Sequence, residues 1–195
     1  MTERAKLSLP ASYFDALYAA DPDPWAFETS DYERAKYQAT VDALGAHHYR
    51  TALEVGCSIG VLTERLAPHC DWLLGIDASA LALNRARARC GHLPGVRFAE
   101  RVLPAGWPHG CYDLIVLSEV LYYFDPPDLE RVAGLVGRDI AAGGVVVLVH
   151  WTGETDYPLS GDEAVERFVA ALPELQVTMR RREPAYRLET LRRSG

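Results

Sequence analysis

The chain has 195 residues, of which 49% are hydrophobic and 24% are charged, and its formal net charge is −7. These values are typical of a globular protein of one domain, and the negative charge argues against a nucleic-acid partner, because neutralising phosphates requires a basic face. The N-terminus lacks an apolar segment of signal-peptide length, and no later segment is apolar for the length of a membrane span, so we expect a cytoplasmic protein with no membrane partner.

The first part of the chain has the pattern of helices. A short helix is predicted at SYFDALYAA (12–20) after Pro10, a proline-interrupted loop at DPDPWAF (21–27), and a longer helix at SDYERAKYQATVDALGA (30–46). Ser30 or Asp31 caps the second helix and Gly45 ends it. Because these helices precede the alternating elements that follow, we expect residues 1–46 to form a helical cap within a single domain of residues 1–195.

From Thr51 onward short apolar strands alternate with helices. The predicted strands are TALEV, DWLLGID, GVRFAE, YDLIVLSEV, GGVVVLVHW, ELQVTMRR and AYRLETLRR, and the predicted helices are GVLTERLA, ASALALNRARARC, PDLERVAGLVGRDI and GDEAVERFVAAL. This alternation predicts a doubly wound, mostly parallel, seven-stranded α/β sheet in residues 51–195. In such sheets ligands bind beyond the carboxyl ends of the central strands.

Cysteines and clustered arginines give weaker signals. The cysteines at positions 57, 70, 90 and 111 form no C-x-x-C pair and have no zinc-like spacing to histidine, so we expect reduced thiols and no metal site. The six arginines between positions 180 and 193 fit a solvated final strand and tail.

The stretch LEVGCSIG turns tightly through Gly56 and Gly60 after the first core strand. A dinucleotide-binding fold has G-x-G-x-x-G, whose second glycine admits a pyrophosphate, and Ser58 stands at that position. The loop therefore suits a ligand without a pyrophosphate. At the end of the next strand, Asp77 stands where an acid binds both hydroxyls of a ribose. The alternative is that Asp77 only caps the following helix.

Four segments, LEVGCSIG, LLGID, YDLIVLSEVLYYF and IAAGGVVVLVHW, occur in the order that resembles the class I S-adenosylmethionine-dependent methyltransferases, a Rossmann-like fold. DPWAFETSDYERAKYQATVDAL, SEVLYYF and WTGETDYPLSGDEAVERF extend the resemblance to the nodulation protein S group. That group N-methylates the free amine of a deacetylated glucosamine residue in a chitin-type lipo-oligosaccharide. The resemblance implies S-adenosylmethionine as cofactor, S-adenosylhomocysteine as its product, and no metal.

The resemblance also implies roles for particular residues. The methionine part of the cofactor would be wrapped by Glu54, Gly56, Cys57, Ser58 and Gly60, the ribose held by Asp77 and the adenine stacked on Ala78, with Ser118 and Glu119 near the methyl group. Arg34 matches an arginine that reaches the cofactor carboxylate, although pairing with Asp31 or Gln38 on its own helix is equally open. The family's adenine-binding aspartate is replaced by Val102, so we expect backbone groups around Arg101 and Val102 to serve there.

An amine acceptor must lose a proton before it can attack a methyl group, which requires a nearby carboxylate or imidazole. Glu119 and His150 are the candidates, at the ends of two core strands. Glu119 as a cofactor ligand only, and His150 as a backbone-bonded core histidine, remain alternatives. Aromatic faces suit sugar rings or a cationic centre, and the candidates to contact the acceptor are Trp25, Tyr122, Tyr123 and Trp151, of which at least one tyrosine fits core packing instead.

The expected function is methyl transfer to a small or oligomeric acceptor, most simply a glucosamine-type amine. An O-methyltransferase of a secondary metabolite and a non-catalytic binding protein remain alternatives. An NAD-dependent oxidoreductase is disfavoured by Ser58 and by the lack of a Tyr-x-x-x-Lys pair. The sequence leaves the oligomeric state open.

Overall fold

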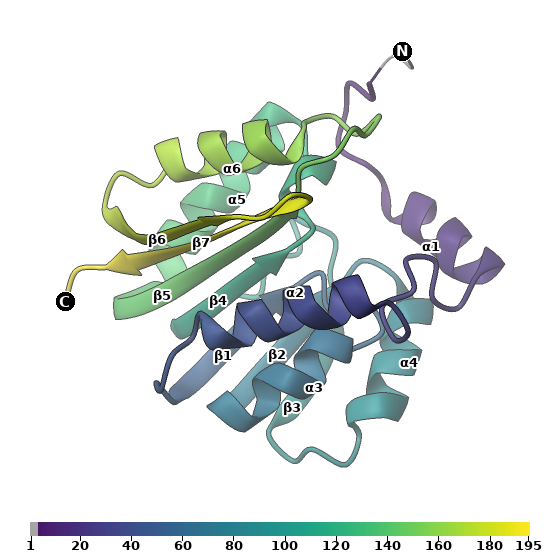
Figure 1. The fold of residues 1–195 in the computed structure, drawn as a ribbon, viewed down its shortest axis with the longest axis horizontal. Coiled ribbons are helices and arrows are strands. Elements are labelled where there is room, and N and C mark those ends of the chain that lie inside the picture. The colour runs from purple at the N-terminus through teal and green to yellow at the C-terminus, as the bar shows by residue number, and fades with distance from the viewer. Residues whose placement is uncertain (1–3) are drawn as a thin grey trace. The chain divides into compact units, whose positions relative to one another are not determined.

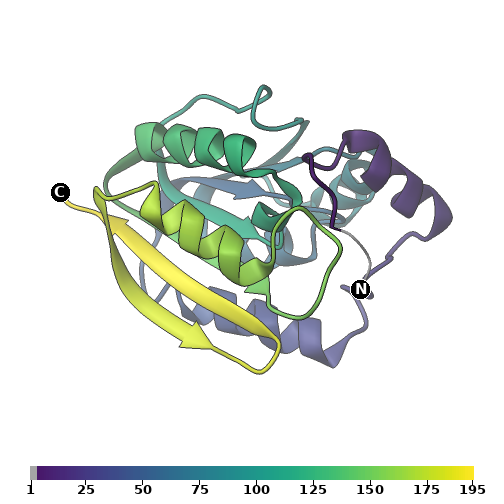
Figure 2. The same ribbon diagram turned by 90° about the horizontal axis from the view of Figure 1, so that it is seen from above.

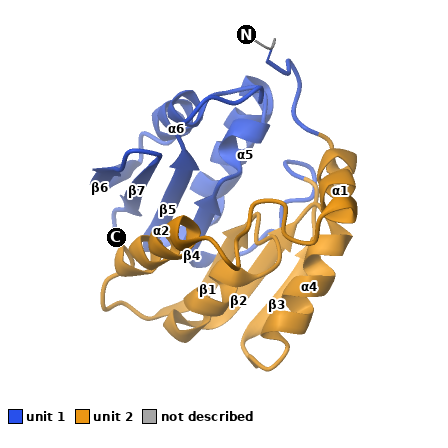
Figure 3. Ribbon diagram, turned by 45° about the vertical axis from the view of Figure 1, so that its right-hand side comes forward, with its two compact units in different colours: residues 1–9, 103–195 blue, residues 10–102 orange. Residues whose placement is uncertain are grey.

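The computed structural model describes residues 4–195 and divides into two compact units (Figure 3). One unit is Pro10–Val102, and the other joins the N-terminal segment up to Leu9 with Leu103–Gly195. The first three residues of the predicted cap lie outside the described part. The assignment of residues 1–195 to one domain stays a prediction.

The unit of residues 10–102 contains both predicted N-terminal helices and the first three strands. Its elements are α1 (Ala11–Ala20), α2 (Asp31–Asp42), β1 (Tyr49–Val55), α3 (Val61–Leu66), η1 (Ala67–His69), β2 (Cys70–Asp77), α4 (Ala80–Cys90) and β3 (Val96–Glu100). The strands are parallel in the order β3-β2-β1. Helix α4 packs on β2 and β3, and α1 packs against α4 (Figure 1).

The remaining strands belong to the other unit. Its elements are β4 (Tyr112–Ser118), η2 (Leu121–Tyr123), α5 (Pro126–Asp139), β5 (Ile140–Trp151), α6 (Gly161–Ala170), β6 (Leu175–Arg182) and β7 (Tyr186–Arg193). Strands β4 and β5 are parallel, whereas β7 is antiparallel to both β5 and β6. Helices α5 and α6 lie side by side, and α6 covers β5 and β7 (Figure 2).

Local chemistry explains most of the boundaries. Ser30 caps α2 by accepting the Glu33 N–H, and Ser160 and Glu163 form a complete capping box at α6. Each predicted helix and strand is present, with ends shifted by a few residues. One shift matters for the site: the strand predicted to run to Val120 ends at Ser118, because Glu119 has a left-handed backbone with φ of 59°.

Two further features bear on the sequence predictions. All four cysteines are free. Within residues 4–195 no helix is both long and apolar enough to cross a membrane.

Candidate active site

The glycine loop after β1 is a sharply turned segment fastened to β2. The backbone N–H groups of Gly56 and Cys57 both donate to the Ile76 carbonyl, at 2.8 and 3.0 Å. Gly60 has φ of 82°, and a Cβ there would lie 3.1 Å from the Ala86 backbone, so only glycine fits without a shift. The loop is therefore shaped by its close approach to β2 and α4.

Ser58 occupies the position where a dinucleotide motif has glycine, and it adopts the left-handed conformation that glycine favours, with φ of 50°. That conformation costs a serine about 1–2 kcal/mol. Two contacts compensate: the Ser58 N–H donates to Asp77 Oδ2 at 2.9 Å, and its hydroxyl shares a short hydrogen bond with the Tyr18 hydroxyl. Ser58 thus connects the loop to β2 and to α1.

Asp77 lies half-buried at the end of β2, and both of its carboxylate oxygens accept backbone N–H groups. Ser58 donates to Oδ2 and Ser79 donates to Oδ1, each at 2.9 Å, and burial raises the pKa of the carboxyl. Each oxygen has a second lone pair, which fits the two hydroxyl donors of a ribose. The residue that caps α4 is Ser79, whose Oγ accepts the Ala82 N–H, so Asp77 is not the helix cap.

Glu54 and Cys57 lie beneath the loop. Glu54 is 1% exposed, accepts the Thr63 hydroxyl at 2.6 Å, and has a pKa raised to about 8, chiefly by burial and further by the Asp77 charge. Burial likewise raises the pKa of the Cys57 thiol well above its usual range, which makes the thiol unreactive. These buried side chains support the loop from beneath, and their predicted contact with the methionine part of a cofactor stays a prediction.

Helix α1 is fastened to both ligand loops. The Ser79 hydroxyl donates to Asp15 at 2.7 Å, and Tyr18 reaches Ser58. Trp25 packs edge-on against Tyr18, with ring centroids 5.7 Å apart, in an apolar cluster that includes Ile59 of the glycine loop. Trp25 therefore lies beside the glycine loop, and the acceptor contact that the sequence predicts for it stays a prediction. Asp15 and Tyr18 could not be identified from the sequence, because they lie in a helix outside the motifs.

Ala78 is half-buried, and three other residues of this unit that are predicted to contact the cofactor are exposed or engaged elsewhere. The Arg34 side chain is 58% exposed and pairs with Asp31 at 2.9 Å, which is the same-helix alternative. The Arg101 N–H donates to the Asp77 carbonyl at 2.9 Å and so is not available to an adenine. Val102 is 49% exposed, which leaves an apolar side chain for an adenine ring.

Glu119 is held rigidly just beyond β4, after the buried Ser118. Its backbone N–H donates to the Val149 carbonyl at 2.8 Å, and its Oε2 accepts both the Tyr122 hydroxyl at 2.6 Å and the Trp151 N–H at 2.8 Å. A carboxylate that accepts two such donors is fixed in orientation. This geometry suits the binding of a cation or the acceptance of a proton.

Three tyrosines pack around this carboxylate. The ring centroids of Tyr122 and Tyr123 are 4.7 Å apart, those of Tyr122 and Tyr157 are 5.4 Å apart, and those of Tyr123 and Tyr157 are 4.7 Å apart. Burial raises the pKa values of Tyr122 and Tyr123 well above their usual range, so these phenols stay protonated as donors. Tyr122 is 5% exposed and fits the core-packing alternative, whereas Trp151 is 36% exposed. Tyr157 could not be identified from the sequence, because it lies in an irregular loop.

His150 is completely buried, and its Nε2 accepts the Leu121 N–H at 3.1 Å. Acceptance from an amide requires that this nitrogen carry no proton. The ring also meets Tyr122 edge-on, with centroids 5.6 Å apart. These contacts fit the backbone-bonded core histidine that the sequence leaves open, and a catalytic role for His150 stays a prediction. Within residues 4–195 no group of three or more His, Cys, Asp or Glu side chains is placed to hold a metal.

Comparison with known proteins identifies the family. Residues 16–138 match the family described as Nodulation protein S (NodS). Nodulation protein S of Rhizobium tropici is 32% identical over 167 residues, which cover 85% of this chain and 70% of that protein. The chain belongs to the nodulation protein S family. The protein of that name from Bradyrhizobium diazoefficiens is 36% identical over 102 residues, or 52% of this chain and 49% of that protein.

Solved structures agree with this assignment. N-methyltransferase NodS from Bradyrhizobium japonicum WM9, in complex with S-adenosyl-L-homocysteine, has a TM-score of 0.83 and 22% identity, covering 96% of this chain and 100% of that one. A protein from Pseudomonas syringae that is described as a putative methyltransferase has 33% identity and a TM-score of 0.72. The match covers 83% of this chain and 99% of that one. The predicted family, fold class and S-adenosylmethionine-dependent methyltransferase are thereby confirmed.

Proposed function

We propose that this member of the nodulation protein S family methylates the free amine of a glucosamine-type residue in a small or oligomeric acceptor. The observation that carries the proposal is the Glu119 carboxylate, fixed at the end of β4 by the Tyr122 hydroxyl and the Trp151 N–H. The free thiols suit a reducing compartment, so the reaction is assigned to the cytoplasm.

The unit of residues 10–102 supplies the cofactor-binding residues. When bound, S-adenosylmethionine supplies a methyl group that passes to the acceptor nitrogen by in-line displacement and leaves a neutral thioether. Asp77 accepts the ribose hydroxyls through the oxygens that already accept Ser58 and Ser79. The backbone of the glycine loop borders the methionine part, and Val102 packs against the adenine. Ala78 and Arg34 are assigned to the same ligand on the strength of the family motifs.

Glu119 handles the proton of the acceptor. An amine arrives mainly as an ammonium ion, which has no lone pair with which to attack, so one proton must leave before the new N–C bond forms. The Glu119 carboxylate binds the ammonium as its counter-ion and accepts that proton, which then passes to water. Tyr122 and Trp151 position the carboxylate, and His150 holds η2, which carries Tyr122, by accepting the Leu121 N–H.

Aromatic surface near Glu119 supports a ring-shaped acceptor. Trp151 is 36% exposed, although its backbone N–H donates to Glu119. Tyr123 and Tyr157 are partly exposed members of the tyrosine cluster. Aromatic faces with a polar edge suit the alternating apolar and hydroxyl faces of a sugar.

The test is Glu119→Gln in a methyl-transfer assay on a deacetylated chitin oligomer, with the product measured by mass. Glutamine keeps the size and an acceptor oxygen for Tyr122 but cannot take a proton. We expect turnover to fall by about a hundredfold or more, with a smaller change in acceptor KM and unchanged affinity for S-adenosylhomocysteine. Glu154→Gln, an exposed acid in the loop after β5, is the matched control. Wild-type turnover in Glu119→Gln would exclude proton acceptance by this residue.

A further inference from the structure

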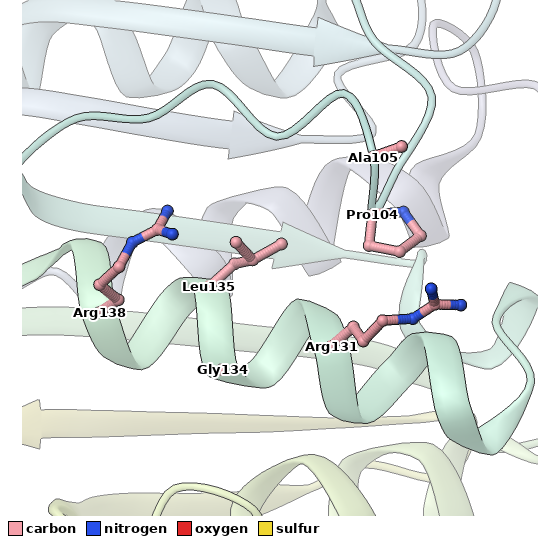
Figure 4. A pocket seen from close by; sticks show the side chains of 6 residues that line it. All are labelled: Pro104, Ala105, Arg131, Gly134, Leu135 and Arg138. Atoms are coloured by element: carbon pink, nitrogen blue, oxygen red, sulfur yellow. The ribbon is translucent and has the colours of Figure 1, made fainter.

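A groove of about 510 Å³ lies along the exposed side of α5, and none of its lining residues belongs to the methyl-transfer site. The lining residues are Pro104, Ala105, Arg131, Gly134, Leu135 and Arg138 (Figure 4). Leu135 lies between the two guanidinium groups, and Pro104 and Ala105 form the opposite wall (Figure 4). The volume lies within the range of small-molecule sites. The lining is apolar except for the two arginines.

Gly134 is one of the residues that line the groove, and it has no packing reason to be glycine. A Cβ at this position would meet no heavy atom within 4 Å in the described residues, apart from its own stretch of helix. Glycine is among the least favourable residues in a helix interior. Its effect here is to leave the α5 backbone bare between Arg131 and Arg138, so that a ligand can approach the helix closely.

Arg138 is a fixed wall of the groove whose charge is already compensated. It makes two hydrogen bonds to Asp139, at 2.6 and 2.9 Å, and Asp139 also accepts the Trp107 indole N–H at 2.8 Å. The pKa of Asp139 is lowered to about 2, first by the Arg138 bond and also by the Trp107 bond, which shows how strongly the carboxylate form is favoured. Arg138 therefore contributes a flat surface rather than an available charge.

The guanidinium group of Arg131 can exchange its ion-pair partner. Its side chain is 67% exposed, and the ion pair that it makes in residues 4–195 is with Asp128, one turn earlier on α5. Asp128 also accepts the Ser8 hydroxyl at 2.5 Å, so its carboxylate has a second donor when Arg131 turns away. Exposed ion pairs contribute little free energy and are easily replaced. An anion at the Arg131 end of the groove can therefore replace Asp128.

We propose that this groove binds a small anionic amphiphile. The anionic group, a carboxylate, sulfonate or phosphate, pairs with Arg131. The apolar ring or chain lies along Leu135 and the bare backbone at Gly134, beneath Pro104, and ends against the flat face of Arg138. The site is separate from methyl transfer and does not depend on the acceptor assigned above.

The experiment is calorimetric titration of the full chain, saturated with S-adenosylhomocysteine, with 2-naphthoate. The cation 2-naphthylmethylammonium has the same ring with the opposite charge and is titrated in parallel. We expect naphthoate to bind with a submillimolar Kd and the cation to give no binding. Arg131→Gln should weaken naphthoate binding about tenfold or more. The matched control is Arg87→Gln, an exposed arginine on α4 that bonds Asn84 one turn earlier, and it should change nothing.

A second variant separates loss of the groove from loss of the fold. Gly134→Leu adds a large side chain from a strong helix former to the groove lining, at a position where a side chain has open space. We expect it to abolish naphthoate binding while the thermal midpoint stays the same or rises. Equal binding of the cation, unchanged binding in Arg131→Gln, or unchanged binding in Gly134→Leu would each overturn the proposal. So would a complete absence of naphthoate binding under saturating S-adenosylhomocysteine, since the groove does not include the cofactor site.

Discussion

Replacement of Glu54 by glutamine should remove a defined pH dependence from the stability of the protein. Glu54 is 1% exposed beneath the glycine loop, and its pKa in the folded chain is raised from 4.5 to about 8, mainly by burial. Between these values the folded state keeps a proton that the unfolded state has lost. The stabilisation is therefore fully present below about pH 4.5 and is lost as the pH rises through about 8.

The size of the effect follows from the pKa interval. One pH unit between the folded and unfolded pKa values corresponds to about 1.4 kcal/mol. Across the interval from 4.5 to about 8, the wild-type free energy of unfolding should fall by roughly 3–5 kcal/mol through Glu54 alone. Glutamine has the same shape, accepts the Thr63 hydroxyl and does not titrate. Its buried NH₂ group adds a pH-independent cost of about 1–3 kcal/mol, so the slope and not the absolute value is diagnostic.

The assay is urea unfolding of both proteins at intervals from about pH 5 to about pH 9, with the free energy of unfolding compared at each pH. Asp77 and Cys57 titrate in both proteins, so their contributions largely cancel in the difference. We expect the variant to gain on the wild type steadily as the pH rises. Parallel curves would show that Glu54 is already ionised in the folded protein near neutral pH, and so would contradict the raised pKa of Glu54.

Other substitutions test the predicted cofactor-binding residues and the surroundings of Glu119. Asp77→Asn should weaken S-adenosylhomocysteine binding, measured by calorimetry, about tenfold or more, since two charge-assisted bonds to a ribose are impaired. Because the bound form needs the Asp77 carboxylate, the affinity of the wild type should fall as the pH falls through the raised pKa of Asp77. The affinity of the variant should lack this pH dependence. Tyr18→Phe, which removes the hydroxyl that meets Ser58, should weaken the same binding several-fold with little change in thermal midpoint, and equal affinity would leave Tyr18 only a packing role. His150→Ala should lower the free energy of unfolding by about 2–4 kcal/mol, since it leaves the buried Leu121 N–H without its acceptor and opens a cavity; unchanged stability with a shifted pH profile of turnover would instead favour proton transfer by His150.

The order of elements and the cofactor loop are predictable from sequence because they depend on local signals. Alternating apolar segments, the cap at Ser30, and the glycines at 56 and 60 all act over a few residues. The left-handed conformation of Ser58 is the exception. From the sequence, a serine at this position indicates only that the glycine of a dinucleotide motif is absent. In the structure Ser58 nevertheless adopts the conformation that glycine favours, and its contacts with Asp77 and Tyr18 compensate the energetic cost.

The features of the site that could not be predicted from the sequence depend on contacts between residues that are far apart along the chain. Tyr18 meets Ser58 and Asp15 meets Ser79 across 40 and 64 residues, and neither pair has a motif. Tyr157 joins the tyrosine cluster from an irregular loop. For His150 the sequence left two roles open, and only its burial and its bond to Leu121 favour the structural one. Burial and partner identity are properties of the packed chain, which a motif does not encode.

We propose above that the protein transfers a methyl group from S-adenosylmethionine to a sugar amine. The most direct measurement incubates the protein and S-adenosylmethionine with two chitin oligomers of equal length, one carrying a single free amine at its end and the other fully acetylated, and follows both by mass. We predict that the first gains one methyl group, located on the nitrogen by fragmentation, and that the second gains none. Methylation of both oligomers at a hydroxyl, or of neither, would exclude methyl transfer to a sugar amine.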